Sequence, residues 1–262
     1  MSDQERAQPG PARPPQLANP LRPREAVILA IREEFPDVLT YTLAFADPEV
    51  QRRYTFAPGQ FNMVSIWGLE EAPLSLSSAP DPGGRFDHTV RGIGNLTRAF
   101  LRLREGDRVG VRGPYGRGWP MEQAKGRDVL LVGGGLGMAP LRSVVETMLT
   151  DPTAYRTLTI VYGARTPANL LYTYDFDRWS AQTSGRLHLT VDRVDGQAWG
   201  GEVGVVTKIL HGMAMPFKDA VAFVVGPEVM MRFTVFELLG RGVQPENIYL
   251  SLERRMRCGV AR

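Results

Sequence analysis

One stretch of the chain, Val129 to Leu149 (VLLVGGGLGMAPLRSVVETML), constrains the fold more than any other. It opens with four apolar residues, as expected of a short, buried parallel strand. Glycines follow at 133, 134, 135 and 137, where a backbone without Cβ atoms can turn sharply and admit a phosphate. Pro140 is expected to begin a helix whose apolar residues share one face. A strand, a glycine loop and a helix N-terminus together predict an anion site made of backbone N–H groups.

This loop departs from the usual dinucleotide fingerprint. In Gly135-Leu136-Gly137-Met138-Ala139-Pro140, the proline stands in place of the third glycine. The next predicted strand, Leu158–Tyr162, runs into Gly163-Ala164-Arg165-Thr166 and not into the acidic residue that usually holds a ribose. A tight strand-to-helix turn without a ligand is therefore an alternative interpretation of the loop taken alone.

Composition narrows the class of protein. With 262 residues, 43% of them hydrophobic, the chain can bury a core large enough for two domains. The net charge is only +3, and the arginines gathered at the two ends are too scattered to indicate a nucleic-acid surface. No apolar run approaches the roughly 20 residues of a membrane span, and no signal peptide is recognisable. A single cysteine, Cys258, excludes an internal disulfide, so we expect a cytoplasmic protein.

The first part of the chain has the pattern of a tail followed by a small barrel. Residues 1–23 hold six prolines and few apolar residues, which predicts a disordered tail or, alternatively, a segment that docks on a partner. Residues 24–121 read as an antiparallel β-barrel with one short helix, Asn95–Leu103. Its predicted strands are Val27–Ile31, Val38–Ala46, Phe61–Trp67, Phe86–Val90 and Arg108–Val111.

The second part, residues 122–253, alternates strands with helices. This rhythm predicts an α/β domain with a doubly wound parallel sheet and ligands at the carboxyl ends of the strands. After Val129–Val132, the predicted strands are Leu158–Tyr162, Leu187–Val191, Ala220–Val225 and Ile248–Ser251. The predicted helices are Pro140–Leu149, Tyr172–Ala181, Val205–Met213 and Pro227–Gly240.

Two motifs in the barrel can carry chemistry. Ala72-Pro73-Leu74-Ser75-Leu76-Ser77-Ser78 alternates apolar and hydroxylic residues, so it offers amides and small hydroxyls to a flat polar ring. The alternative is a half-buried strand whose serines face water. The second motif, His88 to Thr97, runs from a strand through a glycine turn into a helix, which predicts a second phosphate cradle or else simply a capped helix.

Taken in order, these motifs resemble the ferredoxin–NADP reductase superfamily, which pairs an FAD-binding barrel with a nicotinamide-binding domain. The resemblance covers about Arg24 to Arg262 and includes the PLSLSS strand, the VRGIGNLT turn, the GGGLGMAP loop and VVGPEVMM. The ending, YLSLERRMRCG, is most similar to the diaphorase (gamma) subunits of cytoplasmic NiFe hydrogenases, or sulfhydrogenases. Related groups are one of the subunits of anaerobic sulfite reductase and the electron-transfer subunit of dihydroorotate dehydrogenase.

The resemblance implies roles for individual residues. Pro73, Leu74, Ser75, Leu76 and Ser77 are expected to line the flavin, and Glu253 to approach it. The FAD pyrophosphate is expected at Arg91, Gly92, Gly94 and Thr97. The nicotinamide nucleotide is expected along Gly134, Gly135, Leu136, Gly137, Met138, Ala139 and Pro140, with Arg165 near its adenosine ribose and Gly226, Pro227 and Met230 beside its nicotinamide.

Two departures from the resembled pattern stand out. Many members carry an arginine just before the flavin strand, where this chain has Ala72, so FMN stays an alternative to FAD. In the hydrogenase-type branch, the cysteine after ERRM begins a motif for a 2Fe-2S cluster, which usually needs four thiolates. This chain has Cys258 alone, in the segment 254–262. We therefore expect a chain cut short before its cluster motif, with a lone thiol as the alternative.

The function implied is that of an FAD-dependent diaphorase subunit, passing electrons between NAD(P)H and the iron–sulfur centres of a partner such as a NiFe hydrogenase. The alternatives are a reductase subunit of another assembly, such as sulfite reduction or ferredoxin–NADP transhydrogenation, and a flavin-binding assembly subunit without electron transfer. No catalytic acid, nucleophile or metal site is predicted. His88, His188 and His211 lack metal-ligand spacing, and we expect them to be surface or hydrogen-bonded histidines.

Overall fold

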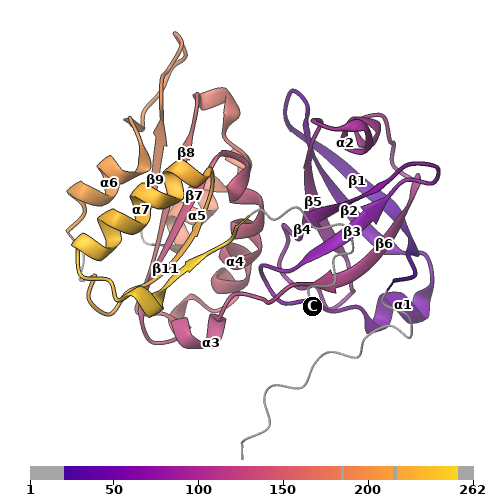
Figure 1. The fold of residues 1–262 in the computed structure, drawn as a ribbon, viewed down its shortest axis with the longest axis horizontal. Helices are drawn as coiled ribbons and strands as arrows, with labels where there is room; N and C mark the ends of the chain where they lie inside the picture. The colour runs from indigo at the N-terminus through magenta and orange to yellow at the C-terminus, as the bar shows by residue number, and fades with distance from the viewer. Residues whose placement is uncertain (1–20, 184–185, 215–216, 253–262) are drawn as a thin grey trace, which may run out of the picture.

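The computed structural model describes residues 21–183, 186–214 and 217–252. They form two lobes side by side, a barrel and an α/β lobe (Figure 1). The predicted disordered tail, apart from its last three residues, lies outside the described residues. The domain boundary predicted between residues 121 and 122 falls inside a short helix, α3 (Met121–Ala124), that follows the link between the two lobes.

The first lobe is the antiparallel barrel that the alternating sequence pattern predicts. Its strands lie in the order β4-β3-β6-β1-β2-β5, with β2 paired antiparallel to both β1 and β5 and with two register shifts along β1. A bridge between Leu76 and His88 connects the two end strands and closes the sheet. The strand bounds are Arg24–Phe35 (β1), Val38–Phe45 (β2), Phe61–Ser65 (β3), Glu71–Ser75 (β4), Phe86–Arg91 (β5) and Arg108–Tyr115 (β6).

The second lobe is a six-stranded sheet in the order β10-β9-β8-β7-β11-β12, with all neighbouring strands parallel. Its strands are Asp128–Gly134 (β7), Thr157–Ala164 (β8), Leu187–Val191 (β9), Glu202–Val203 (β10), Val221–Val225 (β11) and Ile248–Leu250 (β12). From β7 the chain first forms β8, β9 and β10 on one side of β7, and it then returns to form β11 on the other side. The crevice at the carboxyl ends of β7 and β11 is therefore the topological switch point, where such sheets bind ligands.

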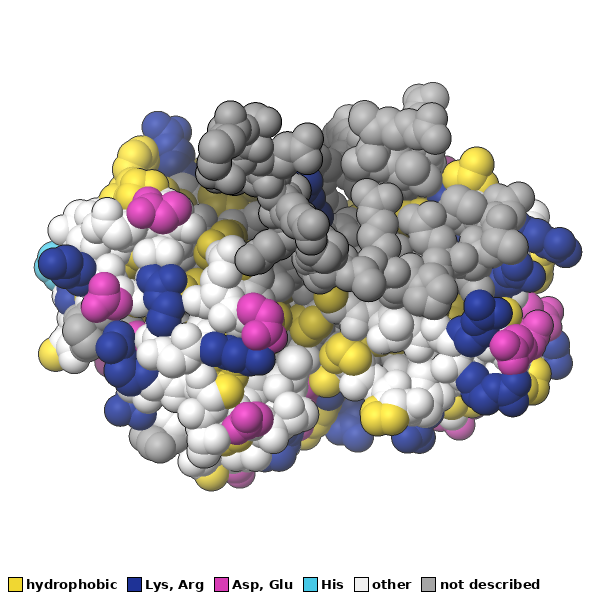
Figure 2. Space-filling view, turned by 90° about the horizontal axis from the view of Figure 1, so that it is seen from below, with side chains coloured by type: hydrophobic (Ala, Val, Ile, Leu, Met, Phe, Trp, Pro, Cys, Tyr) yellow, Lys and Arg dark blue, Asp and Glu magenta, His cyan; other side chains and the backbone are white. Residues whose placement is uncertain are grey.

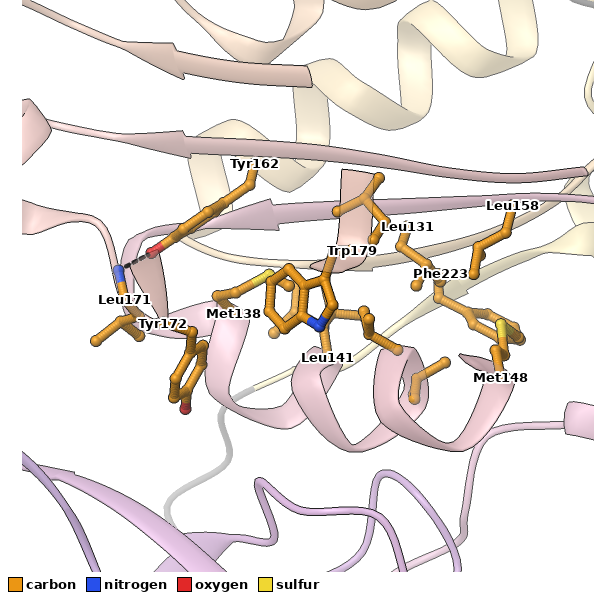
Figure 3. Packing of buried hydrophobic residues seen from close by; sticks show 14 of the residues in the cluster. Leu131, Met138, Leu141, Met148, Leu158, Tyr162, Leu171, Tyr172, Trp179 and Phe223 are labelled. Atoms are coloured by element: carbon orange, nitrogen blue, oxygen red, sulfur yellow. Dashed lines mark hydrogen bonds between the residues drawn. The ribbon is translucent and has the colours of Figure 1, made fainter. Parts of the chain in front are cut away.

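Helices cover both faces of the parallel sheet. Successive residues of β7 point to opposite faces, with Leu131 on the side of α4 (Met138–Thr150) and Leu130 on the side of α7 (Glu228–Gly240). Figure 3 shows the α4 side, where Leu141 and Met148 lie among buried aromatic rings. The remaining helices are Pro48–Arg53 (α1), Asn95–Phe100 (α2), Phe176–Gln182 (α5) and Val206–Gly212 (α6).

The structure corrects several predicted element boundaries. A 3₁₀ turn, Gly135–Gly137, precedes α4, so the helix begins at Met138 and the prediction that Pro140 begins it is wrong. Proline is still tolerated there because N–H groups of a first helical turn have no intrahelical acceptor. The helix predicted from Tyr172 begins only at Phe176, because Tyr172 has left-handed backbone angles (φ 60°, ψ 32°). Helices α1 and α3 and strand β10 were not predicted.

None of the helices in the described ranges is long and apolar enough to cross a membrane. On the face seen in Figure 2, basic and acidic side chains are interspersed.

Candidate functional site

The glycine loop lies at the switch point and is packed against the segment that follows β11. A Cβ on Gly134 would lie 2.2 Å from the Met230 sulfur, and a Cβ on Gly137 would lie 2.6 Å from the carbonyl oxygen of Val225. Gly226 approaches in the same way, since its own Cβ would lie 3.2 Å from the Gly134 Cα. The structure thus brings together the predicted residues of the loop and those of the Gly226 segment, and at Gly137, where the neighbour is backbone, glycine is required for the close approach.

At Gly135, unlike at Gly134 and Gly137, the loop is not packed against a neighbour. Gly135 has a φ of +53°, and a Cβ there would meet nothing within 4 Å. The Tyr162 hydroxyl donates to the Gly135 carbonyl oxygen (3.2 Å) and accepts a hydrogen bond from the Leu171 N–H (3.0 Å; Figure 3). Burial raises the pKa of Tyr162, so this hydroxyl keeps its proton. The Tyr162 hydroxyl therefore anchors the loop through the Gly135 carbonyl oxygen, while the space beside the Gly135 Cα is open.

Other predicted residues of the nucleotide lobe differ in exposure. Met138 and Ala139 are buried, so beyond packing they offer only backbone groups to a ligand. Leu136 is 37% exposed. Arg165 is exposed just after β8, and its carbonyl oxygen accepts from the Arg193 N–H (3.1 Å). Pro227 is exposed at the start of α7.

In the barrel, the side chains of the predicted flavin strand alternate between buried and accessible positions, with the two-residue period of a β-strand. Leu74 and Leu76 are buried in the barrel core, and Ser77 is fully buried as well. Pro73 is exposed and Ser75 is half-buried. Only Pro73 and Ser75 therefore present side chains on the accessible face, while the leucines contribute backbone groups.

A buried histidine holds this strand in place. His88 on β5 is 1% exposed, and its Nδ1–H donates to the Ser75 carbonyl oxygen (2.8 Å). The side-chain amide of Asn62 donates to His88 Nε2 (3.1 Å), and the Tyr54 hydroxyl donates to the Asn62 amide oxygen (3.0 Å). Burial lowers the pKa of His88 to about 4, so the ring is neutral near pH 7. This confirms the expectation of a hydrogen-bonded histidine.

The turn after β5 is closed by its own threonine. Thr97 Oγ1 accepts from the N–H groups of Ile93 (3.0 Å) and Gly94 (2.9 Å). A Cβ on Gly94 would meet only this hydroxyl, at 3.9 Å, so the turn is open above Gly94. Gly92 is different, because its Cβ would lie 2.4 Å from a Leu101 methyl group. Arg91 is exposed at the end of β5.

Sequence reasoning missed the polar residues between the two lobes. Arg142 on α4 donates hydrogen bonds to the Ser77 carbonyl oxygen and to Asp87, both in the barrel. It also contacts Asp175 of its own lobe. The one available signal was a charged residue inside the apolar helix sequence LRSVV.

Two predicted residues, Glu253 and Cys258, lie outside the described residues. Among the residues that are described, no group of three or more His, Cys, Asp or Glu side chains is placed to hold a metal ion.

Comparison with known proteins is consistent with this geometry. Residues 131–235 match the family model for the oxidoreductase NAD-binding domain. The chain is 34% identical over 261 residues to sulfhydrogenase 2 subunit gamma of Pyrococcus furiosus, covering 93% of this chain and 88% of that protein. It is 34% identical over 242 residues to a probable dihydroorotate dehydrogenase B electron transfer subunit of Methanocella arvoryzae, covering 92% and 82%.

A solved structure of an NADH-dependent reduced ferredoxin-NADP oxidoreductase is similar over 88% of this chain and 76% of its own, with a TM-score of 0.70 and 29% identity. These similarities extend across both lobes. They confirm the predicted pairing of an antiparallel barrel with a parallel α/β lobe and the predicted superfamily. The chain therefore belongs to the ferredoxin reductase-like family of NAD(P)H oxidoreductases, in the group that contains the sulfhydrogenase gamma subunits and other electron-transfer subunits.

Proposed function

We propose that this protein binds FAD along β4 and the Arg91–Thr97 turn, takes electrons from NAD(P)H bound at the glycine loop, and passes them to iron–sulfur centres of a partner in a hydrogenase-type complex. The observation that carries the proposal is the pair of open glycine turns, one in each lobe. Nothing within 4 Å fills the space beside Gly135, and only the Thr97 hydroxyl borders Gly94. Each of these glycines borders open space and lies just before a helix, which supports a nucleotide site in each lobe.

Each lobe contributes differently to binding. In the α/β lobe, the 3₁₀ turn and the first turn of α4 direct backbone N–H groups toward the nucleotide phosphates. In the barrel, Arg91 is the exposed cation beside the pyrophosphate turn, and Ser75 supplies a hydroxyl beside the flavin ring. His88 holds the Ser75 carbonyl oxygen and thereby the position of that strand.

Bound FAD would supply the redox chemistry, accepting a two-electron hydride from the nicotinamide and releasing electrons one at a time. The protein needs only to bind and orient the flavin and the nicotinamide nucleotide and to exclude water from between them. The buried residues beneath the loop, Met138 and Ala139, close off its underside from solvent.

The partner is proposed from the relatives. The sulfhydrogenase and dihydroorotate dehydrogenase proteins are named as subunits, which supports a redox complex. We propose a hydrogenase-type partner carrying iron–sulfur centres, because the sulfhydrogenase gamma subunit is similar over more of its own length. The dihydroorotate dehydrogenase match supports a second candidate, a reductase subunit of another assembly. A cytoplasmic location stays a prediction.

The test begins with the purified protein. We expect a flavin absorbance spectrum, FAD and not FMN on release, and bleaching of that absorbance by NADH or NADPH without oxygen. Bound flavin that neither nucleotide bleaches would contradict the proposal. Purification of the native complex from its source would then identify the partner, and a partner without iron–sulfur centres would favour the second candidate.

Substitution of Arg165 tests whether this residue sets a preference for NADPH over NADH. If its guanidinium pairs with a 2′-phosphate, R165A raises the NADPH Kd by about tenfold and leaves the NADH Kd unchanged. If it contacts ribose hydroxyls instead, both Kd values rise equally. If it is purely structural, neither changes.

A further inference from the structure

The two lobes are joined by a group of mostly buried polar side chains, which we call the interlobe network. It contains Glu34, Asp87, Thr89, Arg142, Tyr172 and Asp175. Three of these residues come from barrel strands and three from the α/β lobe. None of them was assigned to cofactor binding above.

Arg142 is the centre of the network. Its Nη1 donates to the Ser77 carbonyl oxygen and to Asp87 Oδ2, both at 3.1 Å. Its Nη2 and Nε donate to Asp175 Oδ2 at 3.3 and 3.4 Å. The Arg142 side chain is only 13% exposed. A planar guanidinium satisfies these acceptors from both lobes at once, which the single ammonium of a lysine cannot reproduce.

A tyrosine from the α/β lobe makes the second connection. The Tyr172 hydroxyl is 2.6 Å from the Thr89 hydroxyl on β5, and the Tyr172 N–H donates to Glu34 Oε2 on β1 (2.8 Å). Figure 3 shows the Tyr172 hydroxyl pointing away from α4 toward the barrel ribbon. The Arg142 guanidinium lies over the same ring, 4.7 Å from its centroid. The Tyr172 side chain therefore contacts both Arg142 and the barrel strand β5.

Arg142 lies between the two proposed binding segments. It follows Pro140, the last residue of the nucleotide loop, by two positions, and its acceptor Ser77 is the last residue of the proposed flavin strand. The Arg142 side chain therefore connects the backbone of the flavin strand to α4, the helix whose first residues belong to the nucleotide loop. We infer that Arg142 is a positioning residue that fixes the nucleotide loop against the flavin strand at the separation required for hydride transfer.

This inference rests on the proposed function. In that reaction the nicotinamide C–H bond breaks, its hydrogen and both electrons form an N–H bond on the flavin, and the nicotinamide leaves oxidised. Such a transfer needs the reacting atoms about 3–3.5 Å apart, and a displacement of about 1 Å costs on the order of 100-fold in rate. A residue that sets the spacing of the lobes affects this rate more than it affects the binding of either cofactor.

The experiment compares three variants of the full chain with its bound flavin. R142A removes all the contacts of the guanidinium, and R142K keeps the charge alone. The matched control is R178A, because Arg178 also pairs with Asp175 (2.7 Å) but contacts only residues of its own lobe. Anaerobic stopped-flow reduction gives the hydride-transfer rate and the nucleotide Kd separately. Hydrogen–deuterium exchange of barrel residues 74–78 and 86–89 gives a readout that does not depend on activity.

For R142A we expect unchanged flavin content, a nucleotide Kd within about threefold of the wild type, and a hydride-transfer rate lower by about 10- to 100-fold. Barrel amides at 74–78 and 86–89 should exchange roughly tenfold faster, although the substitution is in the other lobe. R142K should recover part of the rate, and R178A should match the wild type in both measurements.

Wild-type rates and exchange in R142A, or equal losses in R178A, would overturn the inference. A loss of nucleotide affinity with no loss of limiting rate would assign Arg142 to binding instead. If neither nucleotide reduces the wild-type flavin, the proposed function and the hydride-transfer part of the inference both fail. The exchange data then decide separately whether Arg142 holds the two segments together.

Discussion

The two proposed cradles have similar sequences, glycines followed by a helix, but different forces hold them in place. The nucleotide loop is held mainly by close packing, since Gly134 and Gly137 leave little room for a Cβ beside Met230 and the Val225 backbone, and one hydrogen bond from the Tyr162 hydroxyl adds to it. The barrel site is held by hydrogen bonds, through Thr97 in the turn and His88 beneath the strand. Substitutions that add volume should therefore damage the first site, and loss of a hydrogen-bond partner or a change of pH should damage the second.

The largest effect is expected where the packing is tightest. In G137A the new Cβ would lie 2.6 Å from a backbone oxygen, which cannot rotate away, so α4 must shift. We expect a loss of about 3 kcal/mol in the free energy of unfolding, as typical of overpacking. NAD(P)H should no longer bleach the flavin, while the flavin stays bound to the barrel. Urea unfolding and anaerobic titration check both points.

The control for this substitution is G135N. Asparagine tolerates the φ of +53° at this position, and its Cβ meets nothing within 4 Å. G135N should unfold within about 0.5 kcal/mol of the wild type, as expected for an open surface position. If G137A proved as stable as G135N, close packing would not be what shapes the loop.

The second prediction concerns how the stability of the barrel changes as the pH falls. The pKa of His88 is lowered to about 4 in the folded protein, against 6.5 in the unfolded chain, so the unfolded state binds the extra proton between these values. Stability conferred by neutral His88 is therefore fully present above pH 6.5 and is lost as the pH falls toward 4. From the difference between the two pKa values, the loss is about 3 kcal/mol.

The measurement is urea unfolding of the wild type and H88Q from pH 7.5 to 4. Burial also lowers the pKa of His188 in β9, and that contribution is common to both proteins. H88Q should therefore show the shallower decline with acid, although it is less stable at pH 7.5. Parallel pH profiles would exclude His88 as the acid-sensitive group.

The comparison also explains how much was predictable from the sequence. Period-two and helical patterns identify both lobes and place the glycine loop after β7, because these features are local. The start of α4 was missed because proline is tolerated throughout the first helical turn, so Pro140 indicates that turn and not its first residue. Arg142 was missed because its role depends on Ser77 and Asp87, which are distant in sequence and adjacent only in the folded chain.

The smallest of the expected effects is on flavin binding and comes from a substitution in the Arg91–Thr97 turn. T97V keeps the shape of the side chain but removes the oxygen that accepts from the Ile93 and Gly94 N–H groups. Loss of such a cap typically costs about 1 kcal/mol, which corresponds to roughly a fivefold weaker flavin Kd if the turn must be ordered to bind. T97S keeps the hydroxyl and should bind flavin like the wild type, and the nucleotide Kd should be the same in all three proteins. Flavin titration of the apoproteins decides the matter: if T97V binds as tightly as T97S, the turn is shaped by its glycines, as the nucleotide loop is, and the contrast between the two sites disappears.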